Sequence, residues 1–256
     1  MEKISTTAKQ IKLMTHVVIG YPSLKETEAI VLAMAKAGVD YIELQMPFSD
    51  PLADGPVIMQ ANQVAIKNKI GMQDNLSLMK KLSQKVTIPL LFMGYYNTIF
   101  KYGVSKFCRE AKQAGAYGLI IPDMPLEEEK YEKFYAACKK NNLVNIFVVS
   151  PATTDDRLKK INKYAKGFIY CMARYGITGT NNSLDKKLNS YLKRVKKYIK
   201  LPLGVGFGIS KPEHIKALKN KANIAIIGSA IIKIINKSDR QNRLKNIKNF
   251  IKSLCV

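Results

Sequence analysis

Three acidic side chains lie close together within residues 43–54, in a segment that a helix could not contain. Glu43 ends a short apolar run that predicts a strand, and Asp50 and Asp54 follow in a loop with three prolines and a glycine. A carboxylate inside an apolar strand is costly to bury, so Glu43 needs either an ion pair or a chemical role. The rigid loop and the second acid, Asp54, favour acid–base catalysis over the ion pair.

Two glycine turns near the end of the chain form a second group of residues that could bind a ligand. Gly206, Phe207 and Gly208 follow one predicted strand, and Gly228 and Ser229 follow the next. Glycines let backbone N–H groups approach phosphate oxygens, a serine adds a hydroxyl, and a helix N-terminus adds a favourable dipole. Each turn alone could be an ordinary strand-to-helix connection, but the two together favour phosphate binding.

These residues have to be positioned by a repeating strand–helix pattern that runs along the chain. Eight short apolar runs predict strands at 13–19, 41–44, 89–93, 118–121, 144–149, 167–172, 203–205 and 224–227. Helical stretches separate them, including one predicted over 126–140, and a short extra helix is predicted near the N-terminus, over 2–11. Continuous apolar strands are typical of a parallel sheet that is buried on both faces.

The count and even spacing of the units predict an α/β fold, a closed (β/α)8 TIM barrel that forms a single domain over 1–256. An open doubly wound sheet is the alternative. It would require a glycine-rich turn after the first strand, and the sequence Gly20-Tyr21-Pro22 is not a dinucleotide fingerprint. In a barrel the site lies at the C-terminal ends of the strands, where Glu43 and both glycine turns are expected.

The composition excludes several classes of protein. The chain has 256 residues, 47% of them hydrophobic, and lacks an apolar run long enough for a membrane span or a signal peptide. We therefore expect a cytoplasmic protein. Four widely spaced cysteines indicate reduced thiols, and with only two histidines we expect no metal site.

The formal net charge of +23 is strongly basic, which raises the alternative of a nucleic-acid-binding protein. However, most lysines recur at solvent-facing positions of predicted helices, as in 191–200. This spacing favours a solvated basic face, and we expect no nucleic-acid binding above the nonspecific level.

The acidic loop also carries a resemblance to a known family. Residues 43–56, with the sequence ELQMPFSDPLADGP, resemble the signature of the tryptophan synthase alpha chain family. Further similar stretches follow in the family's order at 122–128, 170–179, 206–210 and 228–233. The resemblance covers essentially the whole chain, and its proline-rich core is highly specific.

The resemblance implies a (β/α)8 barrel that cleaves indole-3-glycerol phosphate to indole and glyceraldehyde 3-phosphate. It implies no cofactor in this chain, because the pyridoxal phosphate of the complete synthase belongs to a beta chain, the expected partner in an alpha2-beta2 heterotetramer. By this resemblance, Glu43 and Asp54 match the family's catalytic residues. Tyr170, Thr178 and Phe207 match its substrate-binding residues. The family's phosphate-binding positions are matched by Gly179, Gly208, Gly228 and Ser229. Its positions near the beta chain are matched by Pro47, Asp50 and Asn97.

Two residues depart from the family pattern. Gln45 stands where the family usually has glycine, and because alternate strand residues share a face, it is expected to crowd or hydrogen-bond near Glu43. His16 stands where an indole-contacting phenylalanine occurs in the family, and we interpret it as a packed aromatic substitute. The polar loop 174–183 is interpreted as an active-site lid in which Thr178 fixes Asp54, with a simple connector as the alternative.

Other functions remain open from the sequence. The glycine turns would also suit another phosphate-binding barrel, such as an isomerase of phosphorylated sugars, although the proline-rich loop would not. A non-catalytic subunit that binds and activates a partner is a third possibility, and an assay of indole release separates these.

Overall fold

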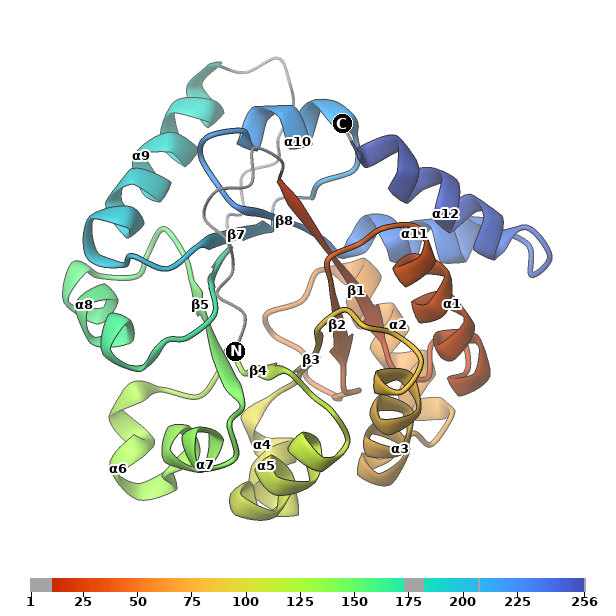
Figure 1. Cartoon of the computed structure of the whole chain (residues 1–256), viewed down its shortest axis with the longest axis horizontal. Coiled ribbons are helices and arrows are strands. Elements are labelled where there is room, and N and C mark those ends of the chain that lie inside the picture. Colours follow the sequence, from red (N-terminus) through yellow and green to blue (C-terminus); the bar gives the residue numbers. More distant parts are fainter. Residues whose placement is uncertain (1–10, 173–181, 207, 256) are drawn as a thin grey trace.

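The computed structural model of the chain describes residues 11–172, 182–206 and 208–255, and it has the predicted barrel at its centre. Eight parallel strands pair in sequence order and close between the last strand and the first (Figure 1). The strands are β1 (Lys12–Val18), β2 (Tyr41–Gln45), β3 (Leu90–Met93), β4 (Gly118–Ile120), β5 (Val144–Val149), β6 (Ile169–Met172), β7 (Leu203–Gly206) and β8 (Ile224–Ile227).

Helices form an outer ring around the strands (Figure 1). They are α1 (Leu24–Lys36), α2 (Pro56–Lys67), α3 (Met72–Ser83), α4 (Tyr96–Tyr102), α5 (Val104–Gln113), α6 (Glu129–Glu132), α7 (Phe134–Lys140), α8 (Asp155–Tyr164), α9 (Asn182–Tyr198), α10 (Pro212–Leu218), α11 (Ser229–Lys237) and α12 (Arg243–Leu254), with a 3-10 turn, η1 (Leu126–Glu128). The alternation of strands and helices confirms the predicted fold class. Among the described residues, no helix is both long enough and apolar enough to cross a membrane.

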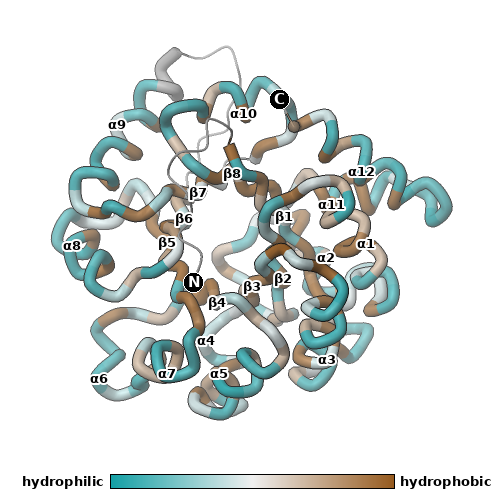
Figure 2. Tube along the Cα trace, viewed as in Figure 1, coloured by the Kyte–Doolittle hydropathy of each residue, from teal (hydrophilic) through white to brown (hydrophobic). Residues whose placement is uncertain are grey.

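The strands are buried on both faces, which explains their continuous apolar sequences. Hydrophobic residues follow the strands and the inward sides of the helices, while hydrophilic residues cover the outside (Figure 2). One large core cluster packs the outer faces of the strands against the helices, and a smaller one that includes Met14, Tyr41, Phe168 and Ile226 fills the barrel. Both cores are needed because a parallel sheet has no solvated face.

The register of the first two strands places the unusual polar residues inside the barrel. Met14 and Tyr41 pair and both belong to the inner cluster. Alternate residues share a face, so His16 follows Met14 on the inner face while Glu43 and Gln45 follow Tyr41. His16 and Glu43 are direct register partners. The side chains that the sequence singled out are therefore neighbours at the C-terminal end of the barrel.

The structure differs from the sequence-based expectation at two helices. The single helix predicted over 126–140 is wrong: the segment is divided into η1, α6 and α7, because Lys133 adopts a left-handed backbone conformation with φ 52°. Helix α4 was not predicted, and its first amide, that of Tyr96, donates to the Asp123 carboxylate. The predicted N-terminal helix and most of loop 174–183 lie outside the described residues.

Candidate active site

The two candidate catalytic acids line one small cavity at the C-terminal end of the barrel. Its volume is about 110 Å³, and its wall includes His16, Glu43, Asp54 and Tyr170 together with apolar side chains. Glu43 comes from β2 and is only 2% exposed, whereas Asp54 comes from the loop between β2 and α2 and is partly exposed. The barrel thus supplies one acid on a rigid strand and the loop brings a second acid over it.

Polar contacts connect these acids to the first two strands. His16 Nδ1 lies 3.5 Å from Glu43 Oε1, and both side chains are almost fully buried. Gln45 Nε2 donates a hydrogen bond to Asp54 Oδ2 at 2.6 Å. The Tyr95 hydroxyl accepts a hydrogen bond from the backbone N–H of Ala53 at 3.0 Å, which anchors the loop next to Asp54. Each acid therefore has a defined neighbour before any ligand is considered.

The electrostatics of this group follow from burial and from the pairing of charges. Burial alone would lower the pKa of His16, but the Glu43 carboxylate raises that pKa above its usual value. Burial raises the pKa of Asp54, while His16 and the Gln45 hydrogen bond act in the opposite direction. Burial, with the nearby Glu43 and Asp54, raises the pKa of Tyr170, which therefore keeps its proton. The cavity can hold and exchange protons in a largely apolar environment.

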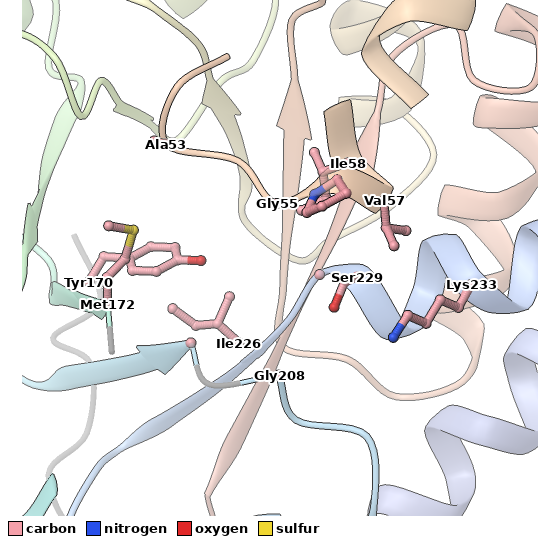
Figure 3. Close-up of a pocket in the computed structure, with 13 residues that line it drawn as sticks. Ala53, Gly55, Val57, Ile58, Tyr170, Met172, Gly208, Ile226, Ser229 and Lys233 are labelled. Atoms are coloured by element: carbon pink, nitrogen blue, oxygen red, sulfur yellow. The ribbon is translucent and has the colours of Figure 1, made fainter. Parts of the chain in front are cut away.

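A larger cavity, of about 450 Å³, shares Tyr170 and Gly228 with the small one. Its wall includes the late glycine turns (Figure 3). Gly208, Gly228 and Ser229, three of the residues for which phosphate binding is predicted, line it. Ser229 begins α11, and within the described residues no side chain caps that helix terminus at Gly228. Gly208 has φ 65°, a backbone conformation that favours glycine. This end of the cavity offers a helix N-terminus, a hydroxyl and close access to backbone.

Tyr170 lines both cavities, so it lies between the pair of acids and the glycine turns. The sequence did not assign a role to Lys233, which also lines the larger cavity (Figure 3). Lys233 lies four residues after Ser229 on α11, so the two share a helix face. That spacing is the signal by which Lys233 could have been found. Its ammonium adds a positive charge at the end of the site that a phosphate would occupy.

The other predicted site residues divide into two groups. On the outer surface beside the site, Asp50 and Asn97 are exposed and Pro47 is half-buried, so a partner could reach them. The residues Thr178, Gly179 and Phe207 lie outside the described residues. Within the part of the chain that the structure describes, no three His, Cys, Asp or Glu side chains are grouped as metal ligands would be.

The fold and site define a class of protein: a (β/α)8 barrel enzyme with an acid pair and a glycine-lined cavity at its C-terminal face. A sequence model of the tryptophan synthase alpha chain matches residues 3–254. The tryptophan synthase alpha chain of Petrotoga mobilis is 45% identical over 100% of both chains, and that of Desulfotalea psychrophila is 42% identical over 96% of this chain and 94% of its own. The chain belongs to the tryptophan synthase alpha chain family.

Solved structures agree with this assignment. The tryptophan synthase A-subunit from the hyperthermophile Pyrococcus furiosus is similar with a TM-score of 0.87 at 31% identity, covering 95% of this chain and 97% of that one. A chain of tryptophan synthase from M. tuberculosis is similar with a TM-score of 0.85 at 27% identity, covering 96% and 92%. The reaction of the family is the cleavage of indole-3-glycerol phosphate, which makes this chain a lyase of tryptophan biosynthesis.

Proposed function

We propose that Glu43 and Asp54 carry out the retro-aldol cleavage of indole-3-glycerol phosphate to indole and glyceraldehyde 3-phosphate. The observation that carries these roles is that one small, largely apolar cavity is lined by both acids. Breaking the carbon–carbon bond requires electrons to be left on C3 of indole. Protonation of C3 creates a positive indolenine nitrogen, and that nitrogen accepts the electron pair as the bond breaks.

The two acids have different parts in this mechanism. Glu43, on the strand, delivers the proton to C3 and removes the proton from the hydroxyl of the adjoining glycerol carbon. Such a transfer typically contributes about 10²–10⁴-fold to a rate. Asp54 accepts the hydrogen bond from the indole N–H and stabilises the charge that develops there. Tyr170 packs beside the substrate between the two cavities.

The larger cavity is proposed to hold the phosphate. Gly208, Gly228 and Ser229 would present backbone N–H groups and one hydroxyl, and the α11 dipole favours an anion at this terminus. Lys233 would supply a compensating positive charge. The sequence-based roles of Thr178, Gly179 and Phe207 remain predictions.

The beta chain is the proposed partner, in an alpha2-beta2 complex that receives the indole. The support for it is the chain's membership of the family and its similarity to a chain of the M. tuberculosis tryptophan synthase. Pro47, Asp50 and Asn97 would face the partner. The cleavage involves no net oxidation or reduction, so we assign no cofactor to this chain and pyridoxal phosphate to the beta chain. We also propose that residues 1–256 form a single domain, which the closed barrel supports. The proposed location is the cytoplasm.

The decisive experiment is an assay of the purified chain with indole-3-glycerol phosphate, with and without a beta chain. Release of indole by the isolated chain, stimulated by the partner, is the expected result. If the chain releases no indole and only stimulates the reaction of the beta chain, it is a binding subunit. The roles assigned to Glu43 and Asp54 would then be wrong.

A further inference from the structure

The loop that carries Asp54 is an unusual support for a catalytic acid because its neighbouring residues are exposed. Leu52 is 88% exposed, and Ala53 and Gly55 are exposed as well. Local apolar packing therefore does little to fix the carboxylate. An acid that must meet one substrate atom needs support that restricts its side-chain rotamer.

Gln45 provides such support from the barrel wall. It is the last residue of β2, its side chain is fully buried, and it follows Glu43 on the same inner face of the strand. Its Nε2 donates to Asp54 Oδ2 at 2.6 Å, while among the described residues its own Oε1 has no hydrogen-bond partner. The amide N–H is thus committed to the Asp54 carboxylate, while the same side chain also acts on His16 and raises the pKa of that imidazole.

We propose that Gln45 is a positioning residue of this enzyme: its amide N–H holds the Asp54 carboxylate over the small cavity, in the orientation that meets the indole N–H. The inference rests on the proposed role of Asp54 and deepens it. Since β2 also carries Glu43, the same strand fixes both acids. Their separation is then set by the barrel and not by the exposed loop.

The hydrogen bond also favours the charged form of Asp54. Burial and the nearby Glu43 act to protonate this carboxyl, whereas the Gln45 donor, His16 and Tyr95 keep its pKa from rising further. A protonated Asp54 could not stabilise a positive indolenine nitrogen. Gln45 therefore supports the same step in two ways, through the orientation of the carboxylate and through its ionisation.

Gln45→Met tests the inference because methionine has a similar length and volume but no donor. We expect kcat for indole release to fall about 10-fold to 100-fold, as for loss of a hydrogen bond to a charged group, with a smaller change in KM. The acid limb of the pH profile of kcat should move to higher pH, since Asp54 loses a contact that favours its charged form. A purely structural role of Gln45 would not move that limb.

Thr15→Val is the matched control, because Thr15 is equally buried on the adjacent strand and its hydroxyl has no partner in the described part of the chain. It should leave kcat and the pH profile unchanged. Gln45→Leu serves as the second non-donor variant if the methionine variant does not fold, and its expected behaviour is the same.

The outcomes also separate this inference from the proposed function. An inactive Asp54→Asn variant together with a Gln45→Met variant of unaltered kcat and pH profile would overturn the positioning role alone. An Asp54→Asn variant of normal activity would overturn the role of Asp54, and the role of Gln45 with it. Loss in both variants, with the shifted acid limb in Gln45→Met, supports both.

Discussion

His16 and Glu43 are register partners on adjacent strands, and His16 Nδ1 lies 3.5 Å from Glu43 Oε1 inside the barrel. The pair is almost completely shielded from water, and the Glu43 carboxylate raises the pKa of His16. His16 was expected to act as a packed aromatic substitute. It is packed, with 4% exposure, but it also presents a polar atom to the proposed general acid–base residue.

This contact predicts a pH dependence of stability. Since the pKa of His16 is raised in the folded chain, its stabilisation is complete below the unfolded value of about 6.5 and is lost as the pH rises through the raised pKa. The unfolding free energy of the natural chain should therefore fall above pH 6.5 more steeply than that of His16→Phe. The slope for one proton is at most about 1.4 kcal/mol per pH unit.

Urea unfolding at several pH values measures this difference, and His214→Gln is the control. Burial and the neighbouring Lys211 lower the pKa of His214, so its titration acts in the opposite direction, and stability gained from it increases with pH. Parallel stability curves for the natural chain and His16→Phe would show that the two side chains are not coupled.

The second prediction concerns Glu43. Glu43→Gln preserves the shape of the side chain but removes the proton that the mechanism requires, so indole release should fall by at least about 10²-fold. Circular dichroism and thermal unfolding should show that the barrel remains folded. A well-folded variant that cleaves the substrate at a nearly normal rate would contradict the assignment.

The third prediction concerns the phosphate end of the site. A Cβ atom at Gly228 would make only ordinary contacts, 3.5 Å from Ile58 Cδ1 and 3.7 Å from His16 Cβ, so Gly228→Val should fold. Its methyl groups would occupy the cavity and block close approach of an anion. We expect indolepropanol phosphate to bind at least about tenfold more weakly, a loss of about 1.4 kcal/mol.

Three further variants calibrate that result. Ser229→Ala removes one hydrogen bond and should cost about 0.5–1.5 kcal/mol of binding. Lys233→Met should weaken binding because it removes a positive charge from the cavity wall, while Lys237→Met, one turn further along α11 and outside that cavity, should not. Isothermal titration measures all four variants. Equal dissociation constants for the two lysine variants would remove Lys233 from the site.

The barrel and the position of the candidate site at its C-terminal end could be predicted from the sequence, because both depend on local sequence patterns. Continuous apolar runs gave eight strands, and turns at their ends located Glu43 and Gly228. The division of helix 126–140 could not be predicted, because an apolar periodicity carries no sign that Lys133 takes a left-handed conformation. The hydrogen bond from Gln45 to Asp54 could not be predicted either, because it depends on the backbone conformation of the loop that carries Asp54.

The last prediction concerns the surface proposed to face the beta chain. Asp50 is exposed on the loop that four residues later carries Asp54, so binding at Asp50 can act directly on the position of a catalytic acid. Asp50→Lys reverses a charge at the proposed contact without burying it. We expect the isolated chain to keep its fold and basal activity, whereas stimulation by the beta chain should require at least about tenfold more partner.

Glu213→Lys is the matched control, because it makes the same charge change at an exposed position on α10, away from the acidic loop. It should leave the concentration of beta chain at half-maximal stimulation unchanged. A titration of each variant with beta chain, followed by indole release, distinguishes the two. If both reversals weaken stimulation equally, the effect comes from net charge and not from a contact at Asp50, and the proposed interface has to be sought on another face of the barrel.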